Sequence, residues 1–322
     1  MTRNRLIATG CRSAIGGILI YLIITRFSVG AIVQNIRQVD TTLFLQVAVA
    51  YGLANVFVVV RWYLIMRSME MKIHFFTVVK SYLVGIFFNL FLPTSIGGDV
   101  VKAYYISRKV PTNRMEKTLF SVFFDRYLGF LVMLGVGSGC SLFLEAELAG
   151  VSLSPLLFAL LLILFTGSVV LVVSAERIDQ VVERVHVIKK RFSHSFQRIA
   201  MIVNVTTWDK KLLMGILICG VANLLMLCFM HYIFIERIGK VSAFLPLLVF
   251  VPVVIVVTMV PISINGIGVR ELSYVTLFTT LKIDPSISIA MSLFFYSIMF
   301  LFSLPGGIVS LEMIASKKEL TV

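Results

Sequence analysis

Charged and amide side chains lie inside or beside long apolar stretches of this sequence, where an ionised group is expensive. In chain order they are Asn89, Asp99, Lys102, Asp125, Arg126, Asn265, Arg270 and Glu271. Guanidinium groups grip phosphate oxygens through paired hydrogen bonds, whereas an ammonium group attracts them as a point charge. Neighbouring carboxylates keep an empty site neutral or take up a proton. The pattern predicts binding of a phosphate-bearing group; the alternative is that these residues only neutralise one another as structural ion pairs.

Proline and glycine interrupt two of the apolar stretches next to these charges. The predicted hairpin breaks are Pro93, Gly97 and Gly98 in the first stretch, and Pro261, Gly266 and Gly268 in the second. Non-helical backbone is tolerated at membrane depth only where protein or a water-filled cavity surrounds it. A helix that restarts after a break presents free N–H groups, which attract anions. We therefore expect both breaks to border the anion site.

The composition places these residues in a polytopic membrane protein. Of the 322 residues, 59% are hydrophobic and only 14% are charged, whereas a soluble domain carries about 25% charged residues. Several apolar runs approach the ~20 residues that cross a bilayer as a helix. They cover 14–29, 43–64, 75–92, 118–139, 153–174, 212–235, 244–262 and 286–311, with a shorter run at 272–281. We read the first run as a retained helix rather than a signal peptide, and we predict an all-α bundle.

The net charge of +13 is explained by the membrane topology and does not indicate binding of nucleic acid. Lys and Arg concentrate in short loops, as expected for the cytoplasmic side. The loop 140–152 has no Lys or Arg and is expected outside. We therefore predict a multi-pass protein of the inner (cytoplasmic) membrane with both termini in the cytoplasm. The other function that we consider for these Lys and Arg residues is contact with anionic lipid headgroups.

The run 75–92 lies between two basic loops, so a simple crossing would put one of them on the wrong side. A re-entrant hairpin removes this conflict, and the same pattern predicts a second hairpin at 244–283. The segment 175–211 alternates apolar and basic residues at helical spacing. It predicts a cytoplasmic amphipathic helix on the inner leaflet, with a linker helix packed on the bundle as the alternative. Arg61, beside Trp62 and Tyr63, is interpreted as an interfacial anchor.

An internal repeat appears when the chain is shifted by 168 positions. Pro93 then falls on Pro261 and Gly98 on Gly266, while Lys102 falls on Arg270. The flanking runs also coincide, which divides a single transmembrane domain, 1–322, into repeats at 43–139 and 211–311. The predicted topology makes them inverted repeats, each with a broken re-entrant hairpin. Paired broken segments of this kind point to a transporter's substrate site.

Other chemistries find little support in the sequence. The four cysteines and four histidines show no metal-ligand or CxxC spacing, and a phosphate-binding GxxxxGK[ST] loop is absent. We expect no metal site, no cofactor and no enzymatic activity.

The motifs resemble a known family. The first motif is Asn89-Leu90-Phe91-Leu92-Pro93-x-x-x-Gly97-Gly98-Asp99, then Arg108, then Asp125-Arg126-x-x-Gly129. The second motif is Pro261-x-Ser263-x-Asn265-Gly266-x-Gly268-x-Arg270-Glu271. Together they are similar to the motifs of the lysylphosphatidylglycerol synthetase transmembrane region, or flippase-like domain, family. The resemblance implies translocation of a lipid between leaflets, which in the best-known members follows aminoacylation of phosphatidylglycerol. Thr94 departs from the glycine of many members. We find no soluble aminoacyl-transferase domain and therefore expect no lipid synthesis by this chain.

The sequence thus predicts a flippase or transporter for an anionic, aminoacylated or polyprenyl-linked lipid. Its expected partners are membrane lipids. A membrane accessory subunit that recruits a lipid synthase or glycosyltransferase is one alternative. A membrane enzyme acting on a lipid headgroup, with Asp99 or Asp125 as general base, is the other.

Overall fold

The computed structural model describes residues 3–92, 97–109, 115–144, 147–148, 151–152, 154–164, 166–167, 209–260 and 262–319. Its helices are α1 (Arg3–Arg26), α2 (Val29–Arg37), α3 (Thr41–Ser68), α4 (Phe75–Phe91), α5 (Gly97–Ser107), α6 (Met115–Ser141), α9 (Lys210–Arg237), α10 (Phe244–Met259), α11 (Val269–Thr279) and α12 (Pro285–Glu319). A short helix covers Ser154–Leu164, and a 3₁₀ turn, η1, covers Ile264–Gly266. Strands β1 (Glu147–Leu148) and β2 (Val151–Ser152) pair antiparallel. The predicted all-α class is confirmed.

Four of the helices are long and apolar enough to cross a membrane, namely α3, α6, α9 and α12 over Pro285–Leu311. The bent pair α1 and α2 adds a fifth candidate if it is counted as one span. Large apolar side chains are exposed on these helices, for example Val49 and Ile218, which are 60% and 58% exposed. The chain is therefore a multi-pass membrane protein, as predicted.

The N-terminal run is divided into two helices. We expected one helix over 14–29, but α1 ends at Arg26 and α2 starts at Val29 after a bend of 87°. Ser28 explains the restart, because its Oγ accepts a hydrogen bond from the N–H of Ala31 at 3.3 Å and caps α2. The Nδ2 of Asn35 then donates to the Oγ of Ser286, which fastens α2 to α12.

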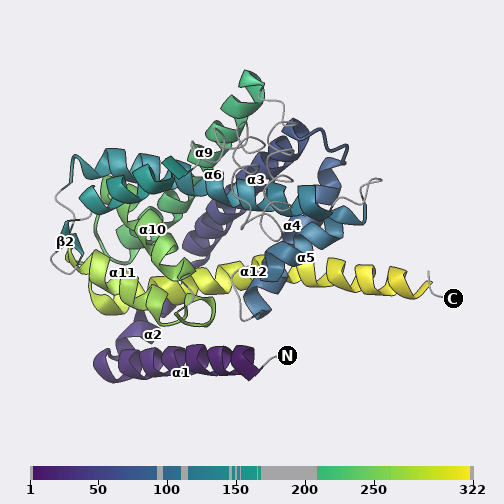
Figure 1. The fold of residues 1–322 in the computed structure, drawn as a ribbon. Coiled ribbons are helices and arrows are strands. Elements are labelled where there is room, and N and C mark those ends of the chain that lie inside the picture. Colours follow the sequence, from purple (N-terminus) through teal and green to yellow (C-terminus); the bar gives the residue numbers. More distant parts are fainter. Residues whose placement is uncertain are drawn as a thin grey trace.

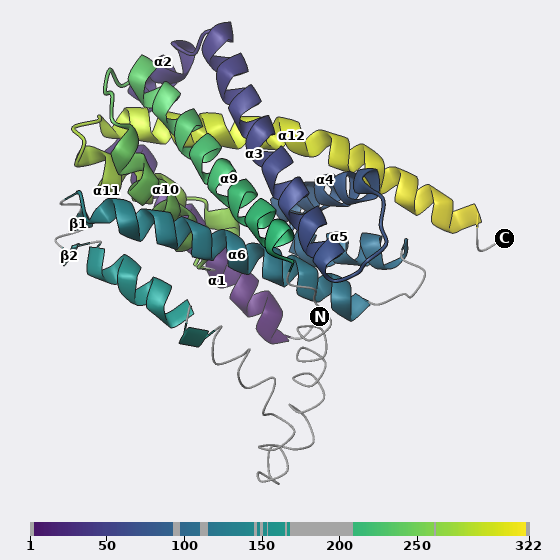
Figure 2. The ribbon, with the colours of Figure 1, turned by 90° about the horizontal axis from the view of Figure 1, so that it is seen from above.

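The helices α3 and α9 lie side by side through the middle of the bundle (Figures 1 and 2). Asp40 caps the start of α3 by accepting from the N–H of Leu43 at 2.8 Å. The same carboxylate pairs with Arg237 at the end of α9, at 3.3 Å. The start of one helix thus meets the end of the other, so the two helices run antiparallel.

Two pairs of shorter helices fill the space beside this central pair. In Figure 1, α4 and α5 occupy one end and α10 and α11 the other, with α6 and α12 crossing above and below. The helix α12 packs on α4 at Gly306, where a Cβ would lie 2.0 Å from the carbonyl oxygen of Leu83. The helix α6 packs on α10 at Gly137, 3.4 Å from the carbonyl oxygen of Leu248 by the same measure. Small residues thus let the long helices approach the short ones.

Several sequence predictions fall outside the described residues. Both predicted break prolines, Pro93 and Pro261, lie there, and so does the amphipathic segment over 175–208. The predicted apolar runs 75–92, 244–262 and 272–281 correspond closely to α4, α10 and α11, whereas α5 matches no predicted run.

Candidate functional site

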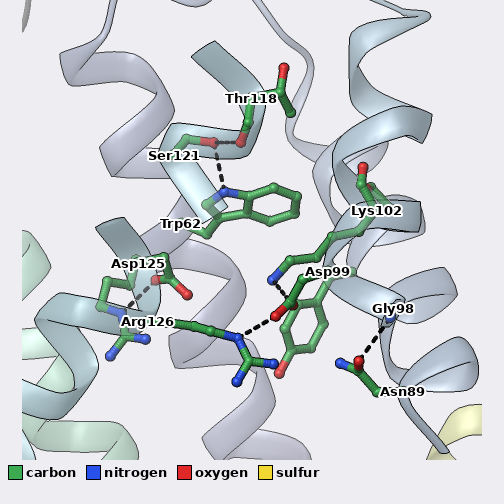
Figure 3. Close-up of polar contacts among 12 residues, drawn as sticks. Trp62, Asn89, Gly98, Asp99, Lys102, Thr118, Ser121, Asp125 and Arg126 are labelled. Carbon is green, nitrogen blue, oxygen red and sulfur yellow. Dashed lines mark hydrogen bonds and ion pairs between the residues drawn. The ribbon is translucent and has the colours of Figure 1, made fainter. Parts of the chain in front are cut away.

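A polar cavity lies within the bundle, among α3, α4, α5, α6, α9 and α10. Its volume is about 230 Å³. Polar side chains that line it are Arg61, Tyr82, Asn89, Asp99, Lys102, Asp125, Arg126 and Asn223. The remaining wall is apolar and includes Phe130, Ile255 and Met259. Figure 3 shows the labelled acidic, basic and amide groups converging from different helices. Five residues predicted for the site, Asn89, Asp99, Lys102, Asp125 and Arg126, are therefore brought together here.

Arg61 belongs to this cavity and is not an interfacial anchor, so that interpretation was wrong. The residue is 5% exposed, and its Nε lies 2.7 Å from the Oδ1 of Asp125. Gly129, one turn beyond Asp125, makes room for the guanidinium, because a Cβ there would lie 3.0 Å from its Nη2. The aromatic neighbours misled the interpretation, since Trp62 is fully buried rather than at a lipid boundary.

Asp99 connects two cations from different helices. Its Oδ1 lies 3.2 Å from the Nζ of Lys102, one turn along α5, and its Oδ2 pairs with the Nε of Arg126 on α6 (Figure 3). Asp99 occupies the first turn of α5, where the helix dipole favours a negative charge. The Arg126 side chain keeps 32% of its surface exposed, whereas that of Asp99 keeps 6%. Arg126 is thus the accessible cation of this cluster.

Aromatic rings hold Lys102 in place. Its Nζ lies 4.7 Å from the centre of the Trp62 ring and 5.8 Å from that of Tyr82. A cation gains electrostatic attraction over such a ring face. The Trp62 ring is itself fixed, because its Nε1 donates to the Oγ of Ser121 at 3.1 Å (Figure 3). The ammonium is therefore held over the two rings beside the cavity.

The first predicted break brings α4 and α5 into close contact. The Oδ1 of Asn89 accepts from the backbone N–H of Gly98 at 2.9 Å, so one free N–H at the start of α5 is satisfied by the preceding helix. A Cβ on Gly98 would lie 2.1 Å from the carbonyl oxygen of Gly85. Glycine is required at this position because any larger residue would separate the two helices.

The second break has a left-handed backbone. Asn265, Gly266 and Gly268 have φ values of 53°, 70° and 84°, a region that glycine and asparagine tolerate best. The Nδ2 of Asn265 donates to the carbonyl oxygen of Leu90 at 2.7 Å. This hydrogen bond joins the second break directly to the end of α4, beside the first.

Arg270 and Glu271 form a separate cluster at the start of α11. The Oε2 of Glu271 accepts from the N–H of Gly268 at 2.6 Å and caps the helix, while its Oε1 lies 2.8 Å from the Nη2 of Arg270. The Oγ of Ser292 on α12 bonds both charged groups. Arg270 also lies over the Tyr296 ring, 4.9 Å from its centre. Within the described chain, the cavity lining includes neither these two residues nor Asn265.

Three polar residues of the cavity were not predicted for the site by the sequence analysis: Arg61, Tyr82 and Asn223. Arg61 carried a usable signal, since it is a charge near the end of an apolar run. Asn223 also carried one, because the sequence Gly52-x-Ala54-Asn55 of α3 recurs as Gly220-x-Ala222-Asn223 in α9 at the same shift of 168 positions. Nothing in the sequence distinguishes Tyr82 from other aromatic residues.

The cavity contains donors and acceptors suited to an anion, with no sign of metal ligation. Across the described residues, no group of three or more His, Cys, Asp or Glu side chains is placed to hold a metal ion. Among the described residues that line the cavity, the three cations Arg61, Lys102 and Arg126 outnumber the two carboxylates, Asp99 and Asp125, by one.

The chain matches a known family. The family model described as the lysylphosphatidylglycerol synthase TM region matches residues 11–307, which is nearly the whole chain. No curated protein matches the chain.

Proposed function

The chain belongs to the lysylphosphatidylglycerol synthase transmembrane-region family, and on that premise we propose that it is a lipid flippase. The observation that carries the proposal is the partly open cavity between apolar helices, whose described lining carries three cations against two carboxylates. The lipid headgroup would occupy this cavity with its phosphate near Arg126, Lys102 and Arg61. Its acyl chains would remain in the bilayer.

The position of the charges supports binding of an anion. Ionisable groups at membrane depth are costly unless they are paired or used. Mutual pairing alone would require equal numbers of cations and carboxylates, whereas the lining has an excess of one cation. A phosphodiester carries one negative charge and would neutralise the cavity. Arg126 offers it the partly exposed guanidinium.

The order of elements supports two inverted repeats. Each proposed unit has a long helix, a broken pair and a second long helix: α3, α4, α5 and α6, then α9, α10, α11 and α12. The antiparallel contact of α3 with α9, through Asp40 and Arg237, agrees with units of opposite orientation. Rocking of one unit against the other would then expose the cavity to each leaflet in turn.

The short helices support re-entrant hairpins within these units. The helices α5 and α11 have 11 residues each, so each is about 16 Å long, well short of a hydrocarbon core of about 30 Å. Each packs against the helix before it. We propose that α4 with α5, and α10 with α11, enter and leave the membrane on one side.

We further propose a transporter without enzymatic activity, in the inner membrane, with both termini cytoplasmic. A general base needs a carboxylate that can accept a proton from the substrate. Asp99 and Asp125 are instead engaged by Lys102, Arg126 and Arg61, which suits charge balance in a binding site. The cytoplasmic position of both termini is inferred from the distribution of Lys and Arg.

The test is movement of fluorescent phospholipids and a polyprenyl phosphate in liposomes that contain only this protein, with and without proton and sodium gradients. We expect one lipid class to move, and Arg126→Gln to slow it about tenfold or more, because a charge-assisted hydrogen bond is lost. Arg37→Gln is the matched control, since Arg37 is exposed at the end of α2. Absence of movement under every gradient, with folded protein, would reject the flippase and favour an accessory subunit.

A further inference from the structure

Besides its cations, the cavity is lined by two uncharged polar side chains, Asn223 and Tyr82. Both residues line the cavity, and Asn223 is 6% exposed. What each can offer a ligand depends on which of its atoms the protein already uses.

The orientation of the Asn223 amide is fixed by a backbone carbonyl. Its Nδ2 donates to the carbonyl oxygen of Ala54 on α3 at 3.0 Å. A carbonyl only accepts, so the nitrogen must point at Ala54 and the Oδ1 must point elsewhere. No donor among the described residues reaches this oxygen, which therefore remains an acceptor at the cavity wall.

The hydroxyl of Tyr82 is also limited to accepting. The Nδ2 of Asn55 donates to the carbonyl oxygen of Tyr51 at 2.7 Å, which turns the Oδ1 of Asn55 towards Tyr82. The Tyr82 hydroxyl donates its only proton to that oxygen at 2.9 Å. Its lone pairs are then what it can offer a ligand.

A complementary headgroup has a phosphate for the cations and a hydrogen-bond donor for Asn223 and Tyr82. An ammonium could supply the donor, but it would add positive charge to a cavity whose described lining already has more cations than carboxylates. A neutral hydroxyl supplies the donor without this repulsion. The volume of about 230 Å³ equals that of about eight liquid waters, which accommodates a phosphate with one small polyol.

We propose that this cavity selects an anionic phosphodiester with a hydroxylated headgroup, through Asn223 and Tyr82, and discriminates against aminoacylated lipid. The inference rests on the proposed function and specifies its substrate. Glycerol and a single sugar ring share the required chemistry.

The experiment compares phosphatidylglycerol with phosphatidylethanol of the same acyl chains, by competitive binding in nanodiscs and by transport in liposomes. Both lipids carry one negative charge, but only the first has headgroup hydroxyls. We expect the full-length protein to prefer phosphatidylglycerol about fivefold to tenfold, the value of one or two neutral hydrogen bonds. Phosphatidylinositol, as a second hydroxylated lipid, distinguishes a ring from glycerol.

Two variants test the residues named. Asn223→Leu and Tyr82→Phe, which keeps the ring over Lys102, should each reduce the preference to about threefold or less, and the double variant should bring it to near one. Asn35→Leu is the matched control, because Asn35 bonds Ser286 away from the cavity, and it should leave the ratio unchanged. The ratio separates selectivity from folding, since a merely destabilised variant would lose both lipids together.

Four outcomes overturn parts of the proposal. A wild-type ratio near one, with transport intact, rejects the hydroxyl selection but leaves the flippase standing. Lysylphosphatidylglycerol that competes as well as phosphatidylglycerol rejects the discrimination by charge. If folded protein moves the polyprenyl phosphate but none of these phospholipids, only the inference is rejected; if it moves none of them under any gradient, both the inference and the flippase are rejected.

Discussion

The two clusters of charge in this molecule use similar residues in different ways. Around the cavity, charges from α3, α5 and α6 meet across helices, and Arg126 remains partly exposed. At the second break, Arg270 and Glu271 are neighbours on α11, and the carboxylate caps its own helix. The first cluster lines the cavity, whereas the charged groups of the second are hydrogen-bonded by the N–H of Gly268 and by Ser292.

This difference shows why charge alone does not identify a binding site in a membrane protein. A pair that caps a helix end and is completed by a serine has few hydrogen bonds left to offer. A cluster that spans three helices and whose described residues include three cations and two carboxylates is suited to accept a counter-charge. The comparison therefore predicts that substitutions in the first cluster change ligand handling, while those in the second mainly change stability.

The largest effect is expected from Asp125→Leu. It leaves the buried guanidinium of Arg61 without its carboxylate, and breaking such a pair costs about 3–5 kcal/mol. The free energy of unfolding, measured by denaturant titration in detergent, should fall by that amount. The double variant Arg61→Met with Asp125→Leu should recover much of it. A loss below about 1 kcal/mol in the single variant would show that the pair is not isolated from water.

A smaller effect is expected from Glu271→Gln. The amide can still accept from the N–H of Gly268 but no longer neutralises Arg270, and we expect a loss of about 1–2 kcal/mol of stability. Lipid movement, scaled to the amount of folded protein, should stay near the wild-type rate. Asp99→Asn is the matched change in the first cluster and should slow movement strongly. If the two variants slow transport equally, the contrast between the clusters is wrong.

The smallest effect is expected from Asn265→Gly, which keeps a residue suited to the positive φ of 53° and removes the hydrogen bond to the carbonyl oxygen of Leu90. One neutral hydrogen bond is worth about 1 kcal/mol. Thermal unfolding in detergent would measure the loss, with Asn265→Ala expected to be worse because alanine is strained at this φ. Equal stability of the glycine variant and the wild type would show that the two breaks are not energetically joined.

The sequence predicted the helices well because their signal is local. The runs 43–64, 118–139, 212–235 and 286–311 correspond to α3, α6, α9 and α12, since apolar length alone determines what can cross a bilayer. The bend at Ser28 was missed, although its serine cap is visible in the sequence. Inverted repeats and re-entrant entry stay predictions, because no membrane boundary is defined by the helices alone.

The site was predictable only in part because burial depends on distant partners. Asp99, Lys102, Asp125 and Arg126 could be selected as charges in apolar surroundings. Arg61 carries a similar signal at the end of its apolar run, but its burial could not be inferred, since its partner Asp125 is 64 positions away. The sequence likewise gave no reason to place Lys102 at the cavity and its counterpart in the repeat, Arg270, away from it.

The distribution of the cavity along the chain has a consequence for biosynthesis. Every charged residue of the cavity comes from α3, α5 or α6, and chains are synthesised from the N-terminus. The ion pairs can therefore close within the first half, sparing the newly inserted segments unpaired charges in lipid. The later helices α9 and α10 contribute only uncharged wall, including Asn223 and Met259. During insertion the charges are thus paired early, and the cavity is enclosed only after α9 and α10 have been translated.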